Sequence, residues 1–184
     1  MKSKKFLAIA GILSLAIMSL SLAAIGATEA GVTATVTPGT ISVTLSTGSV
    51  AYGTVGVPSV DNVPTGDTII DVNNNGGIPE NFQIKGANAA GTTTTWKITT
   101  GAVGGTPDYY YHHKFMDCGS DSGCSSPVAA NTMDTSYESL ATNVPATDGP
   151  TDDRYFKLRL STPTETGGDT TEHSTTATIL ATAY

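Results

Sequence analysis

The chain has 184 residues, with 9 basic and 16 acidic side chains and a formal net charge of −7 at pH 7. A chain this acidic has no electrostatic footprint for nucleic acid or anionic lipid, so we expect neither as a partner. Glycine (20) and proline (9) are frequent, whereas aromatic residues make up only 7% of the chain. This composition favours short strands joined by many turns over helices.

The N-terminal 30 residues indicate an export signal. Three lysines precede an apolar run at residues 6–24, and small residues beyond it offer cleavage positions after Ala27 or Ala30. The run is also long enough to span a bilayer, so an uncleaved membrane anchor is the alternative and the only membrane association we expect. Its many Ser, Ala and Gly residues favour cleavage. We expect a helical signal peptide at 1–30, a single domain at 31–184, and a secreted or cell-surface location.

Alternation of apolar and small polar residues predicts about nine strands after the leader. The first lies at residues 32–36 and places Val32, Ala34 and Val36 on one face. The remaining strand patterns lie at residues 41–45, 50–55, 68–72, 81–85, 93–100, 109–116, 137–144, 155–160 and 174–183.

The Asn-Asn-Asn-Gly-Gly turn at residues 73–77 predicts a hairpin that pairs 68–72 with 81–85, because Asn and Gly adopt the positive φ angles that such turns need. No helical period appears beyond the leader. The predicted fold is therefore all-β, a single antiparallel β-sandwich of jelly-roll or immunoglobulin-like type.

Two cysteines, Cys118 and Cys124, close the short loop Cys-Gly-Ser-Asp-Ser-Gly-Cys. In an exported chain a lone close pair indicates a disulfide. A zinc site with His112 and His113 is the alternative. It is disfavoured because adjacent residues on a strand point to opposite faces and do not converge on one ion.

Acidic and amide side chains in turns raise the question of calcium. Residues 71–76 match the first half of a calcium-binding loop, but Phe82 stands where that loop needs a bidentate Glu. A hairpin turn and solvated loops explain these residues more simply, so we expect no resident cofactor, with calcium as the alternative. The candidate ligands are Asp71, Asn73, Asn75, Asp148, Asp152 and Asp153.

No motif for a nucleophile, a zinc protease or an esterase occurs, and we expect no enzymatic activity. A run of three tyrosines offers a different chemistry, since exposed aromatic rings can stack on sugar rings. Tyr110 points away from its neighbours on a strand, so only Tyr109 and Tyr111 can share a glycan platform. Packing of these rings in the core is the competing interpretation.

Several short runs resemble small secreted surface β-sandwiches of bacteria and archaea. They are Ser-Val-Ala-Tyr-Gly-Thr-Val at 49–55, Gly-Asp-Thr at 66–68 and Val-Asn-Asn-Asn-Gly-Gly at 72–77, with closing strands at 160–164 and 175–182. TasA-like and archaeal bundling-pilus subunits share this plan of a leader followed by one jelly-roll-like sandwich.

The resemblance implies assembly by donor-strand exchange, in which a terminal strand of one subunit completes the sheet of the next. Val32, Ala34 and Val36 would then form the assembly strand. Pairing of that strand within its own domain stays open as the alternative. We expect a structural subunit of an extracellular filament or coat that forms a homopolymer, with a secreted carbohydrate-binding or adhesion module as the alternative.

Overall fold

The computed structural model describes residues 35–36, 38–146 and 152–184. Residues 38–184 form one unit by their backbone contacts, distinct from residues 1–37. The predicted signal peptide, Val32, Ala34 and Asp148 lie outside the described residues. Thr35 and Val36, the described end of the predicted first strand, belong to no strand and are exposed.

All regular structure in the described ranges is β-strand, which confirms the all-β prediction. No helix suited to crossing a membrane is found in residues 35–36, 38–146 and 152–184. The strands are β1 (Val43–Leu45), β2 (Ile69–Asn74), β3 (Glu80–Lys85), β4 (Ala89–Ala90), β5 (Thr95–Ile98), β6 (Tyr110–Gly119), β7 (Asn131–Thr132), β8 (Glu138–Val144), β9 (Asp153–Ser161) and β10 (Thr178–Ala183).

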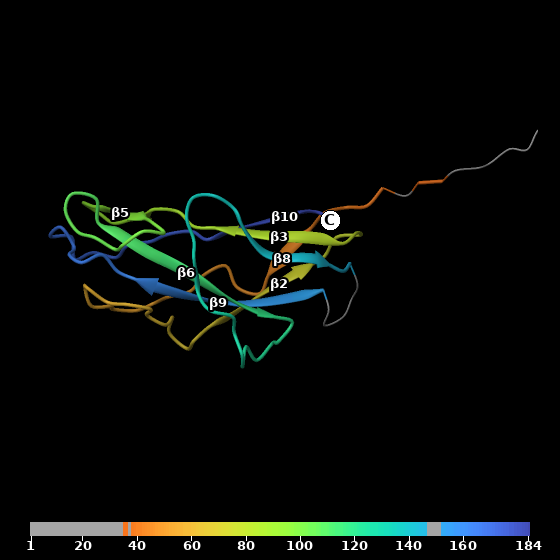
Figure 1. Cartoon of the computed structure of the whole chain (residues 1–184), viewed down its shortest axis with the longest axis horizontal. Coiled ribbons are helices and arrows are strands. Elements are labelled where there is room, and N and C mark those ends of the chain that lie inside the picture. The colour runs from red at the N-terminus through yellow and green to blue at the C-terminus, as the bar shows by residue number, and fades with distance from the viewer. Residues whose placement is uncertain (1–34, 37, 147–151) are drawn as a thin grey trace, which may run out of the picture. The chain divides into compact units, whose positions relative to one another are not determined.

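The strands form two sheets (Figure 1). The large sheet has the order β1-β2-β9-β6-β5-β4, with β7 also paired to β6, and the small sheet has the order β10-β3-β8. The sheets were expected to be purely antiparallel, but β5 and β6 pair in parallel. The reason is the connection at residues 99–109, which carries the chain back so that β6 starts beside β5 and runs in the same direction.

One hydrophobic core joins the two sheets, because both sheets turn alternate apolar side chains toward it. This arrangement fits a β-sandwich. From the large sheet come Ile70, Val72, Trp96, Ile98, Tyr111, Phe115, Phe156, Leu158 and Leu160, and from the small sheet Phe82, Ile84, Leu140 and Val144.

The predicted hairpin between residues 68–72 and 81–85 is wrong. β2 pairs with β1 and β9, whereas β3 pairs with β10 and β8, so the Asn-Gly turn is a corner between sheets. Buried polar side chains hold this corner. The Asn74 side-chain amide donates to the carbonyls of Ile78 (3.0 Å) and Val144 (2.9 Å).

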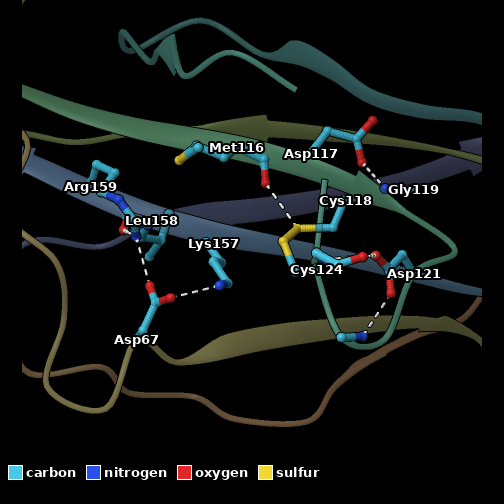
Figure 2. The surroundings of a disulfide bond; sticks show 12 residues. Asp67, Met116, Asp117, Cys118, Gly119, Asp121, Cys124, Lys157, Leu158 and Arg159 are labelled. Atoms are coloured by element: carbon cyan, nitrogen blue, oxygen red, sulfur yellow. Dashed lines mark hydrogen bonds and ion pairs between the residues drawn. A yellow bond between two sulfur atoms is a disulfide. The ribbon is translucent and has the colours of Figure 1, made fainter. Parts of the chain in front are cut away.

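The disulfide closes the loop at the end of β6. Cys118 and Cys124 are joined with their Cα atoms 5.0 Å apart, which confirms the predicted pairing. Figure 2 shows Asp121 in the same loop, where its carboxylate accepts hydrogen bonds from Gly123 N (2.9 Å) and Ser125 N (2.8 Å). These bonds, led by one from the Ser125 hydroxyl, lower the pKa of Asp121. The loop is thus fixed by one covalent bond and by local polar bonds.

The corner makes a prediction about Gly76. A Cβ at this position would lie 2.5 Å from the Thr40 carbonyl oxygen and against the Glu80 carboxylate, so Gly76→Ala forces backbone to move. We expect the free energy of unfolding to fall by about 2 kcal/mol, as for other overpacked sites. Gly56→Ala is the matched control, since no atom lies within 4 Å of its added Cβ. Chemical denaturation measures both, and equal effects of the two substitutions would contradict this account of the corner.

Candidate functional site

A groove of about 820 Å³ opens onto the core where the small sheet stops at β10. Inward side chains of the large sheet form its floor. Two segments border it, residues 45–55 and residues 170–177, and Ile179 of β10 continues the second border. The floor side chains are Ile70, His113, Phe156, Leu158 and Leu160.

β10 is an open edge of the small sheet. It pairs with β3 along its whole length, from Thr178 opposite Lys85 to Ala183 opposite Glu80. Within the part of the chain that the structure describes, its other edge has no strand partner. Its sequence, Thr-Ile-Leu-Ala-Thr-Ala, contains neither the charge nor the proline with which proteins commonly protect such an edge. β10 is therefore a template for another strand.

A strand was predicted at residues 50–55. In the structure, residues 49–57 pair with no strand among the described residues. Their burial nonetheless alternates as in a strand, with a shift of one residue at Gly53, whose φ of 67° lies in the left-handed region. Such a shift at a left-handed glycine is the pattern of a β-bulge. The side chains that pack against the core are Val50, Tyr52, Val55 and Val57.

A neutral polar pair connects this segment to the floor. The Tyr52 hydroxyl lies 3.2 Å from His113 Nε2, and the two rings meet edge to face. His113 is only 3% exposed, and its Nδ1 has no hydrogen-bond partner among the described residues. Burial lowers the pKa of His113 to about 4, and burial raises the pKa of Tyr52. Both side chains are therefore uncharged at neutral pH.

Asp169 anchors the other border of the groove. Its carboxylate accepts hydrogen bonds from the backbone N–H groups of Thr93 (2.8 Å), Thr94 (2.9 Å) and Thr171 (3.0 Å), and from the Thr171 hydroxyl (2.5 Å). These bonds, the Thr171 hydroxyl first, hold the pKa of Asp169 well below its usual range. The carboxylate thus ties residues 169–171 to the turn between β4 and β5.

An aromatic stack reinforces the same border. The His173 ring lies on the Trp96 ring, with centroids 4.0 Å apart and planes 17° apart. His173 Nδ1 lies 3.1 Å from the Thr171 carbonyl, and Nε2 lies 3.1 Å from the Thr94 hydroxyl. These contacts hold the border that leads into β10 against β5 and the turn before it.

Several of the described calcium candidates bond to neighbouring side chains. Asn73 donates its side-chain amide to Asp153 (2.5 Å), and the Asn75 carboxamide oxygen accepts from the Thr44 hydroxyl (2.6 Å). Burial first, and then the charges of Asp153 and Asp152, raise the pKa of Asp71. A group of three or more His, Cys, Asp or Glu able to hold a metal is absent from the described residues.

The tyrosine run lies mostly in the core. Tyr111 is fully buried, and its hydroxyl donates to the Ala87 carbonyl and lies 3.0 Å from the Thr175 hydroxyl. Burial raises its pKa to about 12. Tyr109 is half-buried and packs against the same core. A glycan platform needs accessible ring faces, and Tyr111 offers none in this structure.

Comparison with models of known protein families, with curated proteins and with solved structures finds no match to this chain.

Protonation of His113 makes a prediction about pH. Its native pKa of about 4 lies below the usual 6.5, so the unfolded chain binds the proton first as the pH falls. Acidification from pH 6.5 to pH 4 should therefore lower the free energy of unfolding by about 3 kcal/mol through this group.

We expect His113→Gln to flatten this part of the pH dependence, whatever its effect on stability at pH 7.5. The measurement is denaturant unfolding of both proteins at several pH values between 4 and 7.5. Parallel curves for the two proteins would show that His113 does not titrate in this way.

Proposed function

We propose that this protein is a structural subunit of an extracellular filament or surface coat. In this proposal the N-terminal strand of one copy enters the groove beside β10 of the next copy. The observation that carries the proposal is the uncharged open edge of β10 bordering a groove whose floor is mainly apolar. An extended chain added to such an edge gains backbone hydrogen bonds from the edge and side-chain contacts from the groove.

The occupant to which we commit is the segment at residues 31–37, Gly-Val-Thr-Ala-Thr-Val-Thr, of a second copy. It alternates apolar and hydroxyl side chains, so that Val32, Ala34 and Val36 can face the floor together. None of its side chains is charged, and Glu172 is the only acidic or basic side chain, histidines aside, among the groove's described lining residues.

Charge explains why this contact suits an acidic protein. Copies with a net charge of −7 repel one another, so association needs surfaces that contribute little to that repulsion. An uncharged strand and an apolar groove meet this condition. Because the strand and the groove are different surfaces of the molecule, the contact does not close on itself and generates a fibre.

We also propose a specific type of sandwich and a location for the protein. We take the two sheets as a jelly-roll-like sandwich whose small sheet lacks one strand in the single copy. The leader-like residues 1–30 and the disulfide support an exported, cell-surface protein.

A secreted carbohydrate-binding or adhesion module is the second candidate. The groove volume of about 820 Å³ lies within the range of small-ligand sites, and Trp96 and His173 lie among its lining residues. The mainly aliphatic floor and the buried Trp96 favour an apolar strand over a sugar.

Two variants test assembly, each made from the complete sequence and collected after export. Deletion of residues 31–36 removes the donor strand and leaves the groove intact. Ala177→Lys places a charge in the groove, where Ala177 packs against the core, and leaves the donor intact. We expect the unaltered protein to form filaments and each variant alone to stay monomeric, as measured by negative-stain microscopy and light scattering.

Mixing the two variants provides the decisive step. The Ala177→Lys variant keeps the donor strand and the deletion variant keeps the intact groove. The mixture should therefore form one-to-one pairs and no filament. Val60→Lys is the matched control, because Val60 is 72% exposed and lies outside the groove, and this variant should polymerise normally. Monomers that bind a polysaccharide and never pair would overturn the proposal in favour of the second candidate. Monomers whose own residues 31–37 fill the groove would overturn it in favour of pairing within the domain.

A further inference from the structure

We infer that the incoming strand is bonded along both of its edges, and that residues 49–55 become the strand on its second side. This inference rests on the proposed function, because it concerns the same groove. The small sheet would then grow from three strands to five, in the order β8, β3, β10, incoming strand and residues 49–55.

The side chains of residues 49–55 already have the pattern of a strand. Val50 and Tyr52 are half-buried against the core, whereas Ser49 and Ala51 between and beside them are exposed. A segment with this alternation normally belongs to a sheet, because an isolated extended chain leaves its backbone groups without partners. The side chains of residues 49–55 are thus placed as in a strand, but their backbone pairs with no neighbouring strand among the described residues.

The backbone direction identifies which groups await a partner. Thr65 N–H donates to the Ala51 carbonyl at 2.8 Å, and Thr65 is not among the groove's lining residues. In an extended chain the N–H and C=O of successive residues point to opposite sides. The N–H and C=O groups of Val50 and Tyr52 therefore point away from Thr65, and no described residue bonds to them. Both residues line the groove.

The same groove thus has two borders with unpaired backbone, the outer edge of β10 and residues 50–52. Ile179 of β10 and residues 50–52 line the same groove, and in this inference a strand seated beside β10 has residues 50–52 on its other side. Side-chain packing and the Tyr52–His113 contact hold the segment at the groove in the single copy. Only the backbone hydrogen bonds between this segment and the incoming strand remain to be formed on assembly.

Hydrogen exchange followed by mass spectrometry tests this inference. Backbone amides of residues 178–183 and of residues 50–55 should both exchange more slowly in assembled protein than in the variant lacking residues 31–36. Protection of 178–183 alone would overturn the inference and leave the proposed function standing. An unaltered protein that does not assemble would instead overturn the proposed function.

A pair of adjacent proline substitutions tests the direction of the backbone. Val50→Pro removes an N–H that faces the incoming strand, whereas Ala51→Pro removes one that faces the Thr65 side and keeps the carbonyl that Thr65 needs. We expect Val50→Pro to raise the concentration needed for assembly about fivefold, the effect of one lost hydrogen bond, and Ala51→Pro to change it less than twofold. Thermal unfolding checks that both variants fold. Equal effects of the two substitutions would overturn the inference.

Discussion

Backbone hydrogen bonding along β10 is the constraint on which the rest of this structure depends. β3 satisfies one edge of β10 over all six residues, and no strand in the described part of the chain satisfies the other. The small sheet therefore ends at β10, while Ile70, Phe156 and Leu158 of the large sheet line the groove beside it. A groove over these side chains is the direct result. Apolar surface is costly to leave in water and an unpaired edge is a template for another strand, so one added chain can cover the first and pair with the second.

Polar contacts at the two borders keep the groove in shape without filling it. Asp169 uses one carboxylate to fix residues 169–171 to the turn before β5, and His173 stacks on Trp96 beside it. Tyr52 and His113 meet as neutral groups at the other border, so no buried charge has to be desolvated when a strand enters. Each border is thus attached to the large sheet or its turns and does not rely on the missing strand.

The alternation of side chains in the sequence was enough to predict β3, β8 and β9 to within a few residues, because inward and outward positions differ in polarity there. The same alternation could not say which strands become neighbours. The turn at residues 73–77 has hairpin chemistry, yet Asn74 and the buried Glu80 make it a corner between sheets through contacts with distant residues. Asp169 was missed because its partners at 93 and 94 are remote in sequence, and its own Thr-rich surroundings give no pattern. The strand-like residues 50–55 were recognised by pattern, but only the structure shows that they lack a partner.

The central claim is that another copy of the chain supplies the strand missing beside β10. Cryo-electron microscopy of the assembled protein, at a resolution that traces the backbone, tests it most directly. The account predicts a filament in which residues 31–37 of each subunit lie in the groove of its neighbour, paired with Thr178–Ala183. A filament in which this groove is empty, or in which each subunit fills its own groove, would contradict the account.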